Sequence, residues 1–140
     1  FTFTIIAKEV INIDDILEKH ADILKNAEIF VVDDKIENRM FLVGLLFKWN
    51  MKPTTFNEEQ EALQYLKLCN EFKVGIINID MGGTPLAQKI KQITPDIPLI
   101  AISSSEKEEG NELFDYYIVK PIDQFKLFTY LISCIFNKQK

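Results

Sequence analysis

The sequence predicts an α/β domain built on a doubly wound, five-stranded parallel sheet. Short apolar runs alternate with helix-like segments along most of the chain, and the central runs have the continuous pattern of strands buried on both faces. Five such units in succession favour a parallel sheet with helices on both faces and right-handed crossovers. A chain of 140 residues that is 47% hydrophobic is large enough for one domain with its own core.

Each predicted strand is a short apolar or β-branched run. The five runs are EIFVV (28–32), KPTTF (52–56), VGIIN (74–78), IPLIAI (97–102) and YYIV (116–119). Pro53 indicates that the second run is an edge strand or a strand start, because proline cannot donate a ladder hydrogen bond.

Helical patterns follow each of these runs. The predicted helices cover residues 36–49, 58–69, 85–93, 106–113 and 123–136, and the fourth is a poor helix of about two turns. Pro85 suits the first position of its helix, where a missing N–H leaves no hydrogen bond unmade. Asp123 is the expected N-cap of the last helix.

Polar residues gather where the predicted strands end. They are Asp33 and Asp34 after the first strand, Asn78 and Asp80 at the third, Ser103 at the fourth and Lys120 at the fifth. In open parallel sheets ligands bind at this edge. Two carboxylates suit a hard cation such as Mg²⁺, whereas a hydroxyl and an ammonium suit phosphoryl oxygens. An aspartate can take up a phosphoryl group, but the amide of Asn78 has no comparable nucleophilicity.

Three motifs, in the right order, resemble those of receiver domains of two-component signalling. They are VVDDKIENR (31–39), with the Asn-Arg common in receivers of hybrid histidine kinases, PLIAISS (98–104) and DYYIVKPI (115–122). The resemblance implies a flavodoxin-like sheet of strand order 2-1-3-4-5. It also implies that Ser103, Tyr117 and Lys120 are the phosphate-sensing switch positions.

The middle motif departs from that family. NIDMG (78–82) aligns with the family's Asp-x-x-Met-Pro through Met81, which places Asn78 on the phosphoacceptor and Asp80 two residues beyond it. The segments after Met81 and between Ser103 and Lys120 are also short. These departures predict a degenerate receiver that is not an enzyme, is not phosphorylated and acts by protein–protein interaction.

The resemblance also predicts ligands, partners and location. No cofactor is required, and Mg²⁺ at Asp33 and Asp34 is expected to bind weakly, with Lys120 in ion-pair reach of one of them. Expected partners are a histidine kinase core or a histidine phosphotransfer protein, with a homodimer as an alternative. A net charge of −5 predicts no binding of nucleic acid or membrane. The implied location is cytoplasmic, including the cytoplasmic part of a membrane-bound sensor kinase.

The N-terminal segment FTFTII (1–6) resembles the last strand of a histidine-kinase ATP-binding domain. It predicts that the chain is the C-terminal part of a hybrid histidine kinase. Residues 1–26 would then be the end of the kinase domain and a linker, forming a strand and helix extension, and residues 27–140 the receiver-like domain. The linker carries a helical apolar stripe, formed by Ile13, Ile16, Leu17, Ile23 and Leu24.

Other functions stay open. In an active phosphorelay receiver Asp80 would substitute as the acceptor, which needs a backbone shift that Gly82 and Gly83 would permit. A flavodoxin-like binding or enzymatic domain is a second alternative, although DDKIEN (33–38) lacks a glycine-rich phosphate loop. An engineered Asp-to-Asn change at 78 is a third, against which the short loops argue.

The first and last predicted helices are apolar almost all round. The first carries one stripe of Ile36, Met40, Val43 and Phe47 and further apolar residues elsewhere. In the family's strand order these two helices share one face of the sheet, so their surplus apolar surface would form one patch for a partner or for the linker. The two cysteines, Cys69 and Cys134, read as core or surface thiols.

Overall fold

The computed structural model describes residues 15, 18–19, 24–68, 71–81, 83–104 and 114–139. Predictions for residues 1–14, for most of the linker stripe, for Cys69 and for the helix at 106–113 lie outside these residues. The proposed division at residue 26 stays a prediction.

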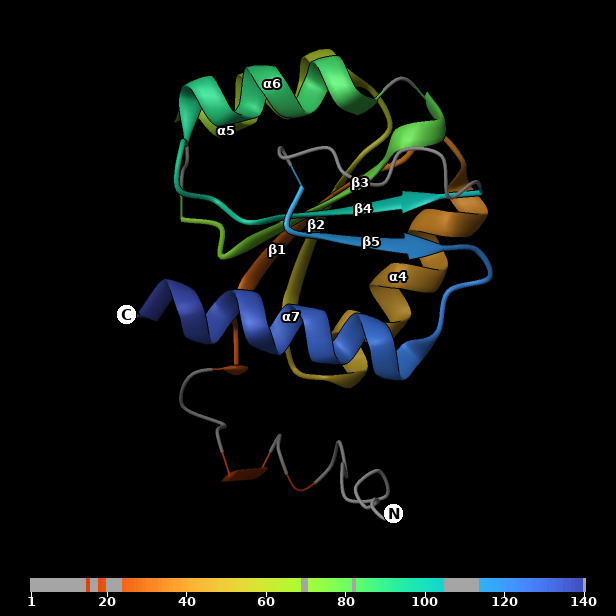
Figure 1. Cartoon of the computed structure of the whole chain (residues 1–140), viewed down its shortest axis with the longest axis vertical. Coiled ribbons are helices and arrows are strands. Elements are labelled where there is room, and N and C mark those ends of the chain that lie inside the picture. Colours follow the sequence, from red (N-terminus) through yellow and green to blue (C-terminus); the bar gives the residue numbers. More distant parts are fainter. Residues whose placement is uncertain are drawn as a thin grey trace.

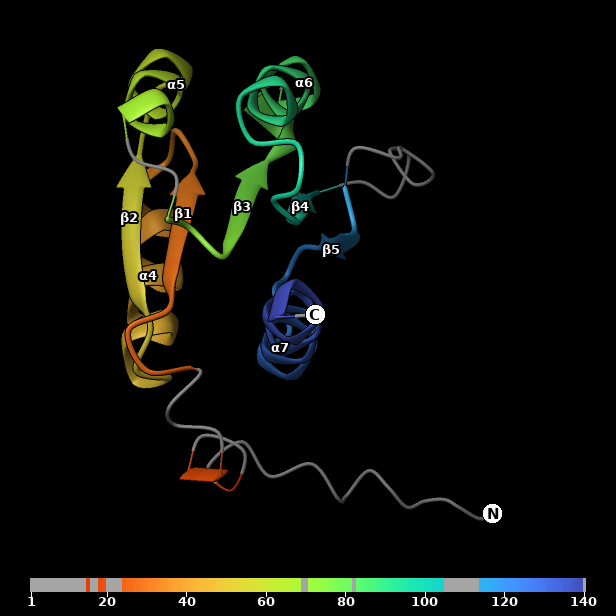
Figure 2. The same ribbon diagram turned by 90° about the vertical axis from the view of Figure 1, so that its left-hand side faces the viewer.

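Five parallel strands form one sheet in the order β2-β1-β3-β4-β5, which confirms the predicted fold class and strand order (Figures 1 and 2). The strands are β1 (Glu28–Val32), β2 (Lys52–Phe56), β3 (Val74–Asn78), β4 (Leu99–Ser103) and β5 (Tyr116–Val119). Every residue of β3 and β4 is buried, as their continuous apolar pattern predicts. β4 begins two residues later than predicted and includes Ser103, which pairs with Val119.

Helices cover both faces of the sheet. α4 (Ile36–Lys48) and α7 (Gln124–Gln139) pack on one face, and α5 (Glu59–Leu68) and α6 (Gly83–Ile93) on the other (Figure 2). α6 begins at Gly83, so Pro85 is its third residue. That position still lies in the first turn, where backbone N–H groups have no intrahelical partner. Asp123 is the N-cap of α7, since its Oδ1 accepts the Phe125 N–H at 2.9 Å.

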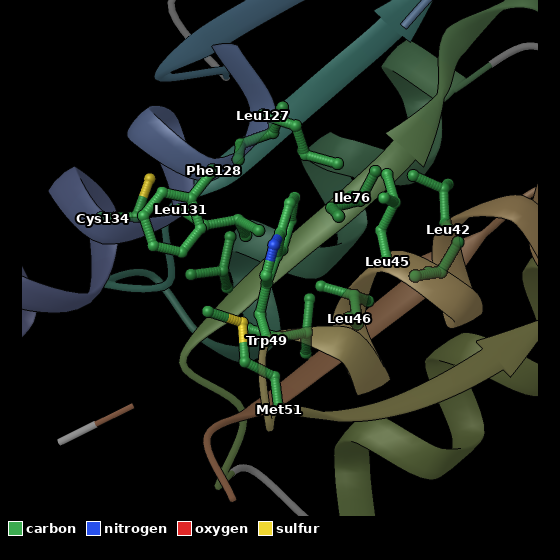
Figure 3. Close-up of a cluster of buried hydrophobic side chains, with 14 of the residues drawn as sticks. Leu42, Leu45, Leu46, Trp49, Met51, Ile76, Leu127, Phe128, Leu131 and Cys134 are labelled. Atoms are coloured by element: carbon green, nitrogen blue, oxygen red, sulfur yellow. The ribbon is translucent and has the colours of Figure 1, made fainter. Parts of the chain in front are cut away.

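The core on the α4–α7 face joins both helices to the sheet. The rings of Trp49 and Phe128 meet edge to face with centroids 5.0 Å apart (Figure 3). Leu24 belongs to the same cluster and is 1% exposed, so the end of the predicted linker packs into the sheet domain. Cys134 is a buried free thiol in this cluster. Burial, with a smaller contribution from Asp115, raises the pKa of Cys134 to about 12.

The apolar stripe predicted on α4 faces away from this core. Leu42, Leu45 and Leu46 are the buried residues of the helix. The exposed large side chains of α4 are Ile36, Met40, Phe41 and Phe47, whereas α7 exposes Phe125. The surplus apolar surface expected of the two helices therefore lies mainly on α4. In the part of the chain that the structure describes, no helix is both long and apolar enough to cross a membrane.

Candidate functional site

The parallel register brings four strand ends to one edge of the sheet. Asp33 comes directly after β1, Asn78 and Ser103 are the last residues of β3 and β4, and Lys120 comes directly after β5. Neighbouring strands pair close to these ends, as Val32 with Ile77 and Ser103 with Val119 show. A single turn of 3-10 helix, Ile79–Met81, follows β3 and carries Asp80.

At this edge the carboxylate of Asp80 contacts groups from the ends of β4 and β5. Its Oδ1 accepts a hydrogen bond from the Ser103 hydroxyl at 3.2 Å. The Ser104 N–H is shared between the two oxygens, at 3.3 Å from Oδ1 and 3.1 Å from Oδ2. The Nζ atom of Lys120 lies 3.5 Å from Oδ2. Three donors from the ends of two further strands therefore bind one carboxylate.

Opposing effects act on the pKa of Asp80. Partial burial raises this pKa, but hydrogen bonds from Ser104 and Ser103 and the positive charge of Lys120 outweigh burial. The pKa of Asp80 therefore lies below its ordinary value of 3.8. The carboxylate is ionised at neutral pH, which is the form that the three donors bind.

Asn78, at the predicted acceptor position, is 2% exposed. Its Oδ1 accepts the backbone N–H of Asp80 at 2.9 Å. Such a bond from an Asn side chain to the backbone two residues on is an Asx turn. The amide thus fixes the start of the 3-10 turn that presents Asp80.

Asp33 is buried, at 1% exposed, whereas Asp34 is exposed. One carboxylate oxygen of Asp33, Oδ1, accepts the Lys35 N–H at 2.9 Å, and its backbone carbonyl accepts Nη1 of Arg39 at 2.7 Å. The other carboxylate oxygen, Oδ2, is buried and has no hydrogen-bond partner among the described residues. An orphaned buried carboxylate oxygen is a feature that suits a cation.

The prediction that Lys120 forms an ion pair with Asp33 or Asp34 is wrong, because Lys120 pairs with Asp80. The 3-10 turn after β3 brings the Asp80 carboxylate beside the ends of β4 and β5. Asp33 is instead held toward the start of α4 by the Lys35 N–H.

Three further observations concern this edge of the sheet. Tyr117, the predicted switch aromatic, is half-buried on β5 and packs edge-on against Phe114, with ring centroids 5.6 Å apart. The sequence reasoning missed the Ser104 N–H as a site group, since nothing in a side-chain motif marks a backbone donor. Among the described residues, no group of three or more His, Cys, Asp or Glu could hold a metal ion.

Comparisons with known proteins bear on the fold. No protein-family model and no curated protein matches the chain. Among solved structures, a response regulator receiver domain protein from Clostridium thermocellum superimposes with a TM-score of 0.75, covering 81% of this chain and 97% of that one at 24% identity. The fold is that of response-regulator receiver domains.

Other receiver structures agree. The response regulator TrrA of Thermotoga maritima, solved in complex with Mg²⁺-BeF, is 23% identical with a TM-score of 0.69 over 76% of this chain and 97% of that one. The chemotaxis protein CheY4 of Vibrio cholerae is 21% identical, also with a TM-score of 0.69, over 77% of this chain and 98% of that one. At these identities the likeness concerns the receiver fold. The roles of Asn78, Asp80 and Lys120 rest on the geometry described above.

Proposed function

We propose that this chain is an atypical receiver domain of a phosphorelay signalling protein, which is not phosphorylated and acts by binding another protein. The observation that carries this proposal is the buried amide of Asn78 at the end of β3. The amide oxygen is already used by the Asp80 N–H, and an amide is a poor phosphoryl acceptor.

Metal binding is weak in this proposal. Phosphoryl chemistry at such an edge would use a divalent cation, and TrrA was solved with Mg²⁺-BeF. Here Mg²⁺ would be held by Oδ2 of Asp33, which has no partner in the described part of the chain, and by the exposed carboxylate of Asp34. Asn78 contributes no charge, so the site has one carboxylate fewer than the family motif supplies.

The exposed side of α4 is the surface that we assign to a protein partner. Ile36, Met40 and Phe47 are 56%, 67% and 62% exposed at helical spacing. A groove lined by Ile36 and Met40 continues to Thr55 on the edge strand β2. Exposed apolar side chains of this size on one helix are typical of interaction sites. From the family resemblance, the partner in this proposal is a histidine kinase core or a histidine phosphotransfer protein. The chain itself would be part of a hybrid histidine kinase.

One observation favours a second function. Asp80 lies against Ser103 and Lys120, the hydroxyl and ammonium that would bind a phosphoryl group. In this alternative Asp80 is the phosphoacceptor of an active phosphorelay receiver. Against it, both carboxylate oxygens already accept bonds from these donors and from Ser104, so attack on a phosphodonor would require their release.

Intact-mass measurement after treatment with acetyl phosphate and Mg²⁺ separates the two functions. We expect no adduct of about 80 Da, the mass of one phosphoryl group, on the unaltered chain. The Asp80→Asn variant is the matched control, because it keeps the size of the side chain. An adduct on the unaltered chain that disappears in Asp80→Asn would establish Asp80 as the acceptor and overturn the proposal.

A further inference from the structure

Ser103, Ser104 and Lys120 bring three hydrogen-bond donors together at the ends of β4 and β5. Their hydroxyl, backbone N–H and ammonium all point donors at one carboxylate. We call these three groups the donor pocket. The three groups are chemically different. Ser103 and Ser104 are adjacent in sequence, whereas Lys120 comes directly after the next strand, β5. Such a set binds oxyanions in general, because carboxylate and phosphoryl oxygens accept the same kinds of hydrogen bond.

The occupant of the donor pocket belongs to the chain itself. Asp80 is held from both sides: its carboxylate by the donor pocket, and its backbone N–H by the buried Oδ1 of Asn78. A ligand tethered within the same chain acts at a high effective concentration, so a free anion would have to displace it. Because Ser103 is only 3% exposed, its hydroxyl has little access to solvent competitors.

This arrangement differs from an ordinary surface ion pair. Exposed pairs of long side chains contribute little, because each side chain must be ordered and water screens the charges. Here buried Ser103 and Asn78 hold Asp80 through its carboxylate and its backbone N–H, although the side chains of Lys120 and Asp80 themselves stay 27% and 34% exposed. The geometry is therefore set by strand ends rather than by two mobile side chains.

We infer that Asp80 is a permanent internal ligand of the donor pocket, standing where a phosphoryl group would bind, and that it holds the ends of β3, β4 and β5 in one state. The inference rests on the proposed function and adds its regulation: the domain presents one surface to its partner without a phosphorylation switch. Its chemical consequence is that the donor pocket is closed to free phosphate in the unaltered chain and opens when the Asp80 carboxylate is removed.

Inorganic phosphate is the probe that tests this consequence. Backbone amide signals of Ser103, Ser104 and Lys120 would be followed by NMR during phosphate titration at pH 7 of the unaltered chain and of Asp80→Ala. We expect no saturable shift in the unaltered chain. In Asp80→Ala we expect saturable shifts at these three residues, with affinity at least roughly tenfold higher than in the unaltered chain.

Asp34→Ala is the matched control, since it removes one exposed carboxylate from the same edge without touching the donor pocket. Phosphate affinity that rises equally in Asp34→Ala and Asp80→Ala would reflect net charge alone and would overturn the inference. The inference would also be overturned if the unaltered chain bound phosphate as tightly as Asp80→Ala does. Asp80→Asn, which keeps the shape but not the charge, provides the same test if Asp80→Ala does not fold.

The phosphate titration and the mass measurement distinguish failure of the inference from failure of the proposed function. A covalent adduct on Asp80 would overturn the proposed function, and with it the inference that rests on it, whatever the titration shows. Absence of phosphate binding in both Asp80 variants would overturn the internal-ligand inference, while the unphosphorylated binding domain would stand.

Discussion

The Oδ1 atom of Asn78 accepts the backbone N–H of Asp80 at 2.9 Å, so the residue at the predicted acceptor position holds in place the carboxylate that fills the donor pocket. An aspartate at 78 could accept the same bond, because a carboxylate oxygen replaces the amide oxygen without a change in shape. What Asn78 removes is therefore charge and nucleophilicity rather than the turn itself.

Asn78→Asp should bind Mg²⁺ more tightly than the unaltered chain. The new carboxylate lies at the end of β3, next to the strand that leads to Asp33, whose Oδ2 has no partner in the part of the chain that the structure describes. A further carboxylate raises the affinity of an oxygen site for a hard cation, here by roughly tenfold or more. Isothermal titration calorimetry measures it. In the double variant Asn78→Asp, Asp33→Asn the gain should be lost, and equal Mg²⁺ affinity with and without Asn78→Asp would contradict the proposed geometry.

The contacts of Asp80 predict how it titrates. Since the folded pKa of Asp80 is lowered from 3.8, its stabilising contacts are fully present above 3.8 and are lost as the pH falls through the lower folded value. The ¹³C shift of the Asp80 carboxyl group should therefore have its midpoint below 3.8. In Lys120→Met, which removes one of the causes, the midpoint should move upward. A midpoint at or above 3.8 in the unaltered chain would mean that the donor pocket does not bind this carboxylate.

Much of the fold follows from residues that are close together in sequence. The limits of β1, β2, β3 and β5 match the apolar runs, because polar or turn residues end each run. The solvent side of α4 could not be predicted, since both sides of the helix are apolar. Contact with the sheet and with α7 decides that Leu42, Leu45 and Leu46 face inward.

The partners of Asp80 could not be predicted for a different reason. Ser103 lies 23 residues along the chain from Asp80, and Lys120 comes from the following strand. The sequence places several carboxylates at the same edge of the sheet as Lys120, but it does not show which of them pairs with Lys120. The 3-10 turn after β3 makes that choice.

Replacing glycine by alanine should change the free energy of unfolding in opposite directions at Gly75 and Gly44. A Cβ atom at Gly75 in β3 would lie 2.1 Å from Cζ of the buried Phe30 ring, whereas one at Gly44 in α4 meets nothing within 4 Å. Gly75→Ala should therefore lower the free energy of unfolding by about 1–3 kcal/mol through overpacking. Gly44→Ala should raise it by about 0.5–1 kcal/mol, since alanine is the better helix former. Urea unfolding of both variants checks this pair, and a neutral Gly75→Ala would mean that Phe30 can move aside.

The burial of Leu24 predicts that the end of the predicted linker contributes to the stability of the folded domain. Its side chain is 1% exposed in the core cluster with Trp49 and Phe128, and the Leu24 carbonyl accepts the Ala27 N–H at 3.1 Å. Leu24→Ala leaves a cavity in that cluster and should lower the free energy of unfolding by about 2–5 kcal/mol. Removing residues 1–25 removes the same side chain, so it should lower the melting temperature as well.

Lys25→Ala is the matched control for Leu24→Ala. Lys25 is the adjacent residue and is exposed, so its truncation should change the free energy of unfolding by less than about 0.5 kcal/mol. Thermal and urea unfolding of the two single variants and of the chain lacking residues 1–25 would be compared. If Leu24→Ala is as stable as Lys25→Ala, the core closes without Leu24 and the linker is a passive tether. If Leu24→Ala is destabilised and the deletion is destabilised to the same extent, Leu24 alone accounts for what the N-terminal segment contributes. A deletion that costs more would show that the segment contributes beyond the Leu24 side chain, through earlier residues or through the Leu24 carbonyl that accepts the Ala27 N–H.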